Sequence, residues 1–389
     1  DVYKRQIIRS ATSWELSAIP MFVWMGEIMF RTDISNRLFR GLSPIVYYLP
    51  GRLLHTNVMG SALFAAVSGS SAATTATVGK ITTTELLKRN YSKSLAFGSL
   101  AGAGTLGLLI PPSIVLIVYG VLAEVSISRL FAAGVYPGIL IATLYSGYIM
   151  IRCLINPSLA PTLEEKPTIK DIAFGLINLI PITILIIIVL GSIYSGIATP
   201  SEAAAVGVLA TLVLTVLTRQ LSMEVFLDSL MGAVRTSCMI ASILLAAAFL
   251  STSMAFLHVP QEVAAGIAKL NLSPYEMIAT LAVFYILLGL FLEGISITVM
   301  SLPITLPLVL AAGFDPIWFG VFLVIMVELA QITPPVGFNL FIIQGLTGTP
   351  IMRVAIASAP FFILMCCAAA IITIFPQIAL WLPDTLFNK

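Results

Sequence analysis

Long uncharged apolar stretches separated by short polar segments make up most of this chain, and their length predicts membrane-spanning helices. Runs near 20 residues match the thickness of the hydrocarbon core of a bilayer. A membrane β-barrel would instead show alternating segments of about 10 residues, and these runs are continuous. The pattern therefore predicts an all-α polytopic membrane protein. We expect eight crossing segments, at about 14–30, 94–122, 128–151, 172–193, 201–218, 224–256, 315–345 and 352–381.

Two further apolar stretches, 53–88 and 277–312, are interrupted in the middle by small and polar residues. The first is broken at Ser68-Gly69-Ser70-Ser71 and the second at Glu293-Gly294-Ile295-Ser296. Each half is short for a comfortable crossing. We therefore expect two re-entrant helical hairpins, each entering and leaving on the same side of the membrane.

The two halves of the chain resemble each other in the spacing of proline, glycine and arginine. Pro111-Pro112 lies 42 residues after Gly69, and Pro334-Pro335 lies 40 residues after Gly294. The match continues with Arg129 and Pro137 in the first half and with Arg353 and Pro360 in the second. The predicted division is a first repeat at 1–153, a polar linker at 154–170, connecting helices at 171–219 and a second repeat at 220–389. Each hairpin follows a predicted interfacial helix, at 33–50 and 258–272.

Composition and charge support a membrane location and an orientation. The chain is 59% hydrophobic and 10% charged, with a mean hydropathy of +1.04, whereas soluble domains carry about 25% charged residues. With the loop after the first hairpin in the cytoplasm, thirteen of the 20 lysines and arginines lie inside, as the positive-inside rule requires. The first hairpin then opens to the cytoplasm and the second to the outside. Inverted repeats with broken helices are typical of secondary transporters.

Four interruptions of the apolar stretches carry the candidate chemistry. Proline removes an N–H group and frees a carbonyl one turn earlier, and glycine lets the backbone unwind. The four interruptions are the first tip, Ser68 to Thr75; the first break, Gly102 to Gly107 with Ile110-Pro111-Pro112-Ser113; the second tip, Gly294 to Thr298; and the second break, Gln331-Ile332-Thr333-Pro334-Pro335-Val336-Gly337.

These residue types suit a cation and an anion side by side. Freed carbonyls and Ser or Thr hydroxyls are ligands for a hard monovalent cation, and half-helix N-termini attract an anion. One tip and one break in each repeat predict two sodium sites flanking one anionic substrate. No arginine lies near the four motifs, so we expect cations to neutralise the substrate. The alternative is structural: small residues that allow close helix packing and prolines that only kink.

Acidic residues within apolar surroundings are costly and invite a functional interpretation. Glu293 adjoins the second tip, and Glu328 precedes the second break by about one turn. Each is a candidate to hold a cation or relay a proton, and the alternative is a hydrogen-bonded structural role. Glu27 is interpreted as interfacial, and Glu202 in Thr199-Pro200-Ser201-Glu202 as part of a helix start.

Several other classes of protein are excluded or disfavoured. There is no Gly-x-x-x-x-Gly-Lys-Ser/Thr phosphate loop for ATP, and no Ser-His-Asp or metal constellation for a membrane enzyme. The four cysteines show no metal spacing. The chain is therefore not expected to be an enzyme or to bind a cofactor, with sodium as its only metal. It begins Asp1-Val2-Tyr3-Lys4-Arg5-Gln6, without methionine or a signal peptide pattern, and we expect an N-terminal truncation.

Several motifs in order resemble the large membrane subunit of the TRAP (tripartite ATP-independent periplasmic) transporters. They are Phe64 to Thr74, Gly104-Thr105-Leu106-Gly107 with Ile110 to Ser113, Thr199 to Ala204, and Ile332 to Leu340. The resemblance implies an elevator-type carrier of the bacterial inner membrane, coupled to sodium. Implied partners are a small four-helix membrane subunit and a periplasmic substrate-binding protein. Implied substrates are carboxylates such as C4-dicarboxylates, sialic acids and other sugar acids.

The resemblance also implies site residues by position. One sodium site would comprise Ser68, Gly69, Ser70, Ser71, Gly104, Gly107, Ile110 and Pro111. The other would comprise Gly294, Ser296, Thr298, Gln331, Thr333, Pro334 and Gly337. The substrate is expected against Ser70, Ser71, Thr74, Pro112, Ser296, Thr298 and Pro335. The chain departs from the family pattern at Glu293-Gly294, where many members have Asp-Pro or Asp-Gly. With the truncation expected above, we also expect the first membrane helix of the family to be missing from this sequence.

The sequence therefore leads to one hypothesis and two alternatives. The hypothesis is sodium-coupled uptake of small organic anions by a TRAP large subunit. A stand-alone sodium or proton symporter of carboxylates is the alternative within transport. A passive channel or a non-transporting membrane scaffold is the alternative from another class.

Overall fold

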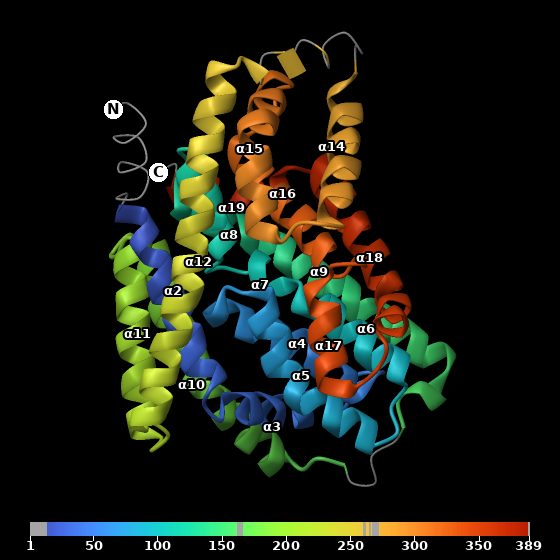
Figure 1. The fold of residues 1–389 in the computed structure, drawn as a ribbon. Coiled ribbons are helices and arrows are strands. Elements are labelled where there is room, and N and C mark those ends of the chain that lie inside the picture. Colours follow the sequence, from blue (N-terminus) through green and yellow to red (C-terminus); the bar gives the residue numbers. More distant parts are fainter. Residues whose placement is uncertain (1–13, 162–165, 260–261, 264–265, 267–271, 388–389) are drawn as a thin grey trace.

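The computed structural model describes residues 14–161, 166–259, 262–263, 266 and 272–387, and the regular elements in this part of the chain are all helices (Figure 1). Seven of the described helices are long and apolar enough to cross a membrane. They are Lys93–Leu122, Ile127–Ile155, Ile169–Tyr194, Pro200–Leu217, Met223–Met254, Gly294–Ala311 and Ile351–Ile374. The all-α membrane fold expected from the sequence is confirmed.

The helix bounds correct some of the expected segments. Only the short helix α2 (Ala18–Phe30), preceded by the 3₁₀ turn η1 (Trp14–Ser17), lies within 14–30. The segment at 352–381 is two helices, α18 (Ile351–Ile374) and α19 (Gln377–Phe387). The expectation that each half of 277–312 is too short to cross is wrong for α15 (Gly294–Ala311), which with 18 residues is long and apolar enough to cross.

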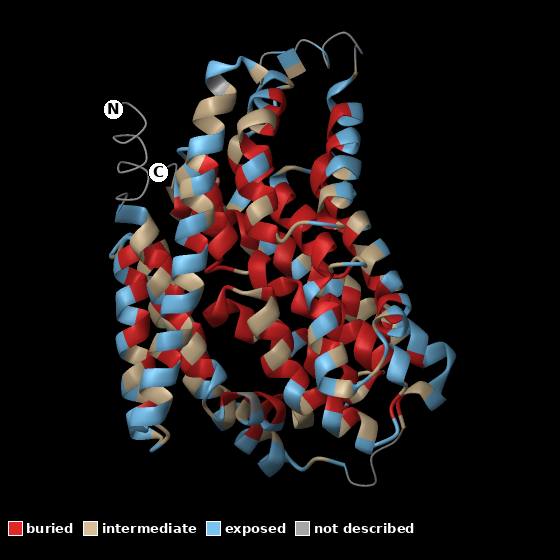
Figure 2. Cartoon of the chain, in the orientation of Figure 1, coloured by how far each residue is buried: buried red, intermediate tan, exposed pale blue. Residues whose placement is uncertain are grey.

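One group of helices packs together at one side of the molecule (Figure 1). It consists of α2, α10 (Ile169–Tyr194), α11 (Pro200–Leu217) and α12 (Met223–Phe256). Arg31 joins α2 to α12 by ion pairs with Glu27 and Asp228. These helices carry exposed apolar side chains such as Phe174 and Leu209, and Figure 2 shows many exposed positions along this group. Exposed apolar side chains on a membrane helix suit contact with lipid.

Several helices begin where side chains satisfy the free N–H groups of the first turn. Thr199 caps α11, and the Glu202 carboxylate accepts a 2.8 Å hydrogen bond from the Thr199 N–H. The same capping box starts α10 at Thr168 and α14 (Pro274–Gly289) at Ser273. Each such cap stabilises its helix by about 1 kcal/mol and so determines where the helix begins. The interpretation of Glu202 as part of a helix start is confirmed.

The centre of the molecule is the interrupted helix α6 (Lys93–Gly104), α7 (Leu106–Leu109) and α8 (Ile114–Leu122). In its most apolar window 83% of the residues are buried, against 17% for α12. Because α6 to α8 is enclosed by other helices while α12 is peripheral, the polar groups freed by its interruptions are shielded from solvent. This is the environment in which exposed backbone is tolerated at membrane depth.

Both apolar stretches with a polar centre are pairs of helices. The first is α4 (His55–Ser68) and α5 (Ser71–Lys88), and the second is α14 and α15. The predicted helix at 33–50 is present as α3 (Ile34–Val46), whereas the predicted helix at 258–272 falls largely outside the described residues. The second crossing helix is divided as expected, into α16 (Pro316–Gln331) and α17 (Phe338–Thr347).

The long helix α9 (Ile127–Ile155) leads from the first repeat into the linker. The short turn η3 (Pro157–Leu159) follows, and the Leu159 carbonyl accepts a 3.0 Å hydrogen bond from the Ser92 N–H. Nearby, the Arg52 guanidinium donates a 2.9 Å bond to the Pro161 carbonyl. The start of the linker is therefore fastened to the ends of the first hairpin.

Candidate ion and substrate site at the helix breaks

The first tip is a sharp reversal between α4 and α5. Gly69 ends α4 with a φ of +60°, a conformation that side chains other than glycine rarely adopt. Ser70 then caps α5, because its hydroxyl accepts a 3.3 Å bond from the Ala73 N–H. Inside the turn the Ser68 and Thr74 hydroxyls lie 2.9 Å apart and share a hydrogen bond. The tip thus presents a helix N-terminus and several hydroxyls within seven residues.

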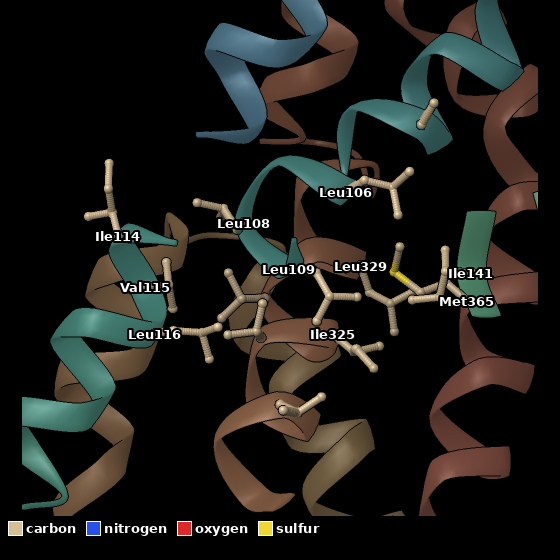
Figure 3. Close-up of a cluster of buried hydrophobic side chains, with 14 of the residues drawn as sticks. Leu106, Leu108, Leu109, Ile114, Val115, Leu116, Ile141, Ile325, Leu329 and Met365 are labelled. Atoms are coloured by element: carbon tan, nitrogen blue, oxygen red, sulfur yellow. The ribbon is translucent and has the colours of Figure 1, made fainter. Parts of the chain in front are cut away.

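The first break contains two interruptions. The helix stops at Thr105, resumes for the single turn of α7, and stops again at Ile110, whose backbone is extended. The Pro111-Pro112 bond is cis, and the Ser113 hydroxyl then caps α8 by accepting a 3.2 Å bond from the Leu116 N–H. Leu106 and Leu109 of α7 pack among apolar side chains of α16, including Ile325 and Leu329 (Figure 3). The polar backbone of the first break is therefore enclosed by apolar side chains.

The structure brings the first tip and the first break into direct contact. A methyl group added to Gly69 would lie 2.8 Å from the Pro112 carbonyl oxygen. The Gly69 carbonyl accepts a 3.5 Å bond from the Ile114 N–H. The Ser71 hydroxyl donates a 3.0 Å bond to the Gly104 carbonyl. The residues expected to form the first half-site are consequently neighbours.

The second tip and second break are also discontinuous. Glu293 caps α15, since its carboxylate accepts bonds from the Ser296 N–H at 3.2 Å and hydroxyl at 3.3 Å. The Thr298 hydroxyl donates to the Gly294 carbonyl of its own helix at 2.9 Å. In the break, the Thr333 hydroxyl donates to the Leu329 carbonyl at 2.6 Å. The Pro334-Pro335 bond is cis, like its equivalent in the first repeat.

Gly294 connects the second tip to the rest of the site. A methyl group on Gly294 would lie 2.5 Å from the side chain of Val327, 3.4 Å from Nε2 of Gln331 and 3.8 Å from Leu108. The tip therefore meets the end of α16, as the sequence predicts, and also approaches α7. The first tip thus contacts α7 at Gly107, the second tip approaches it at Leu108, and the second break meets the second tip at Gln331.

Two residues of the second repeat reach into the first. The Asn339 amide donates to the Ser71 hydroxyl at 2.9 Å. The Glu328 carboxylate accepts a 2.7 Å bond from the Leu108 N–H. Both side chains are buried, with Glu328 only 1% exposed. Glu328 is a candidate from sequence because of its apolar surroundings, but its bond to Leu108 was not predicted. Asn339 was not predicted as a site residue, although its position in an apolar helix is a signal that could have identified it.

The site contains no ion pair among the described residues. The ion pairs in the described part of the chain lie elsewhere and join Arg31 to Glu27 and Asp228, Arg89 to Glu85, and Arg129 to Asp384. An anion at the four interruptions would consequently meet helix N-termini, backbone N–H groups and any bound cation rather than an arginine. Hydroxyls and freed carbonyls supply only oxygen ligands, which hard cations prefer.

Comparison with known proteins agrees with this architecture. The chain matches the family described as "Tripartite ATP-independent periplasmic transporter, DctM component" over residues 1–378. It is 33% identical to the C4-dicarboxylate TRAP transporter large permease protein DctM of Pseudomonas aeruginosa, over 98% of this chain and 89% of that protein. It is 29% identical to the sialic acid TRAP transporter large permease protein SiaM of Vibrio cholerae, over 98% and 88%.

Other relatives are named for different solutes. The ectoine/5-hydroxyectoine TRAP transporter large permease protein UehC of Ruegeria pomeroyi is 30% identical, over 99% of this chain and 90% of that protein. Among solved structures, the YdaH transporter of Alcanivorax borkumensis superimposes with a TM-score of 0.60, over 95% of this chain and 85% of that chain. At 14% identity this likeness shows the fold alone.

These relatives and the seven apolar helices identify a multi-pass protein of the bacterial inner membrane. A transporter permease belongs to no enzyme class. The match over nearly the whole chain, together with the order of the breaks and tips, shows that this chain belongs to the DctM family of large membrane subunits of TRAP transporters.

Proposed function

We propose that this chain takes up small organic anions, chiefly carboxylates, in symport with sodium ions. The observation that supports this function best is the meeting of both tips and the first break at α7, with the second break beside the second tip. Backbone oxygens and N–H groups that an ordinary helix would use internally are freed there. A cation binds the oxygens, and an anion is attracted by the helix N-termini.

The two predicted half-sites are proposed to hold the coupling ions. The first would use Ser68, Gly69, Ser70, Ser71, Gly104, Gly107, Ile110 and Pro111. The second would use Gly294, Ser296, Thr298, Gln331, Thr333, Pro334 and Gly337. The contact between each tip and its own break supports this pairing, since both parts of each proposed coordination shell are already adjacent.

The substrate is proposed to lie between the half-sites, against Ser70, Ser71, Thr74, Pro112, Ser296, Thr298 and Pro335. The hydroxyls of Thr74 and Thr298 are engaged with Ser68 and with the Gly294 carbonyl. Binding would therefore exchange these local bonds for bonds to the carboxylate. Such an exchange favours a charged acceptor, because hydrogen bonds to an anion are about twice as strong as neutral ones.

The carboxylate class is supported by the relatives and by the charges of the site. Relatives are named for C4-dicarboxylates and sialic acid. With no arginine paired at the breaks in the described structure, sodium ions supply the positive charge that balances a carboxylate. The proposed partners are a small membrane subunit and a periplasmic binding protein, which would deliver the substrate.

The transport movement is proposed to be of the elevator type. The group of α2, α10, α11 and α12 would form the static scaffold, and the hairpins with the broken helices would form the moving body. The repeat boundaries expected from the sequence, with the linker at 154–170, fit this division, since the lateral group includes both connecting helices α10 and α11.

Uptake by the reconstituted complex with its binding protein tests the proposal. Labelled dicarboxylate should accumulate only with an inward sodium gradient. Equal rates with and without the gradient would reject sodium coupling. Retention of a small membrane subunit through purification would separate the tripartite system from a stand-alone symporter, and counterflow of labelled substrate would separate a carrier from a channel.

A further inference from the structure

The junction between α6 and α7 lacks a regular helical hydrogen bond, and other elements take over both of its groups. In an unbroken α-helix the Leu108 N–H would bond to the Gly104 carbonyl, four residues earlier. Here the helix is interrupted at Thr105. The Gly104 carbonyl accepts from the Ser71 hydroxyl at 3.0 Å, and the Leu108 N–H donates to Glu328 at 2.7 Å.

The two replacement bonds come from opposite directions and different repeats. Ser71 belongs to the first tip. Its hydroxyl oxygen accepts a 2.9 Å bond from Nδ2 of Asn339 and lies 3.2 Å from Oδ1 of the same amide, a second acceptor beside the Gly104 carbonyl. The Asn339 amide also donates a 3.5 Å bond to the Ala101 carbonyl, three residues before Gly104 in α6. Glu328 stands in the last turn of α16. Two side chains of the second repeat thus hold the groups of the interrupted bond: Glu328 bonds to the Leu108 N–H directly, and Asn339 bonds to the Ser71 hydroxyl that donates to the Gly104 carbonyl.

We propose that Glu328 and Asn339 are positioning residues that keep the first break unwound and fix α7 in place between the two half-sites. The inference rests on the proposed function, in which this break supplies sodium ligands. Glu328 occupies the N–H that rewinding of the helix would require. Asn339 holds the Ser71 hydroxyl beside the carbonyl that rewinding would also require.

A role in packing alone accounts poorly for Glu328. Burying a carboxyl group costs more than burying an apolar side chain of similar size, so an apolar residue would serve a purely structural role as well or better. Rewinding is also the natural alternative at this point, because α6 and α7 are separated only at Thr105 and belong to one apolar span. A strong acceptor for the Leu108 N–H removes that alternative.

In the described part of the chain, the position equivalent to Glu328 in the first repeat makes no corresponding bond to the second repeat. Glu328 precedes Pro334 by six residues, and the matching position in the first repeat, six residues before Pro111, is Thr105. The Thr105 hydroxyl donates to the Gly102 carbonyl of its own helix at 2.5 Å and is not used across the repeats. The second repeat therefore positions the first, and α16 itself remains helical up to Gln331.

Hydrogen–deuterium exchange on the protein in lipid nanodiscs tests the proposal without relying on transport. Glu328→Gln retains a carbonyl acceptor, whereas Glu328→Leu removes it at similar volume. We expect the amide of Leu108 to exchange about tenfold faster in the Leu variant, because this substitution removes the buried acceptor of its hydrogen bond. In the Gln variant the rate should stay within about twofold of the wild type. Peptides of the distal half of α9 report any global loosening.

Asn339→Ala provides a second, independent variant that leaves Glu328 intact. It should also accelerate exchange in the segment 104–108, with the distal half of α9 unchanged. Wild-type exchange of Leu108 in Glu328→Leu, or equal acceleration in the Gln and Leu variants, would overturn the inference. If Glu328→Leu does not fold, unchanged exchange in Asn339→Ala would overturn it equally.

The effect on transport separates positioning from bulk stability. In reconstituted uptake, Glu328→Leu should raise the half-saturating sodium concentration by about tenfold, and Glu328→Gln should restore it to within about threefold of the wild type. A fall in maximal rate alone, with sodium dependence unchanged, would contradict positioning. If the wild type proves independent of sodium, the proposed function fails, but the exchange measurement still decides whether Glu328 holds the break.

Discussion

The backbone of Gly107 lies so close to Ser70 that a methyl group added to Gly107 would come within 2.6 Å of the Ser70 carbonyl oxygen. Only hydrogen fits at that separation, so the first tip and α7 touch backbone to backbone. Such contact leaves the carbonyl and hydroxyl groups on either side in fixed relative positions, which is what a small coordination shell requires.

Gly107→Ala should therefore lower sodium-driven uptake by tenfold or more, since overpacking costs about 1–3 kcal/mol and 1.4 kcal/mol corresponds to about tenfold. The matched control is Gly147→Ala in α9, where an added methyl group meets no atom within 4 Å. Initial uptake rates at equal protein in proteoliposomes check both variants. Wild-type uptake in Gly107→Ala would remove the first break from the site.

Ser70→Ala should raise the sodium concentration needed for half-maximal uptake. The substitution removes the cap of α5, worth about 1 kcal/mol, and also removes a proposed ligand. Ser126→Ala is a matched control, because Ser126 caps α9 with a similar bond, 3.4 Å from the Arg129 N–H. Both variants should lose comparable thermal stability, but only Ser70→Ala should shift the sodium curve. Equal shifts would mean that the cap alone matters.

Glu293→Gln should improve the apparent affinity for a dicarboxylate. The half-buried Glu293 carboxylate caps α15 beside the second tip, and its negative charge opposes an anion there. Removing that charge should lower KM by about two- to tenfold at low salt, the effect of a unit charge at short range in a hydrated site, and less at high salt. Glu276→Gln, in the capping box at the far end of α14, serves as the control. An unchanged or higher KM would contradict the argument.

Trp318→Phe should destabilise the protein by about 1–3 kcal/mol, the cost of leaving a buried carbonyl without its donor. The fully buried indole N–H donates a 2.8 Å bond to the Ile372 carbonyl and so joins α16 to α18. Trp381→Phe is the control, since its ring is half exposed and pairs with Tyr136 through aromatic contact alone. Thermal unfolding in detergent measures both, and equal melting temperatures for both variants would refute the contribution of the indole bond.

The helices and their interruptions could be predicted from sequence because each follows from local chemistry. Apolar length gives the spans, Thr199-Pro200 gives the start of α11, and Gly69 and Pro111-Pro112 give the places where a helix cannot continue. Errors arose where a local rule left two outcomes open. The stretch after Glu293 is long and apolar enough to cross, so its length could not establish re-entrance.

The contacts between the repeats could not be predicted in the same way. Nothing in the residues near Leu108 indicates that its N–H bonds to a carboxylate 220 positions later in the chain. Nor does an asparagine in an apolar helix specify Ser71 as its partner. Such contacts depend on how helices pack in three dimensions, and a single sequence contains only the weaker signal that a polar group in an apolar run needs some partner.

The position of α7 has a consequence for cooperativity. This single turn is hydrogen-bonded to the second repeat through Glu328 and packs directly on the first tip through Gly107. A ligand that tightens either half therefore changes the free energy of the other half through the same four residues. Under the proposed function, linkage makes this influence mutual, so an ion or substrate bound at one half-site should change the affinity of the other half-site by the same factor.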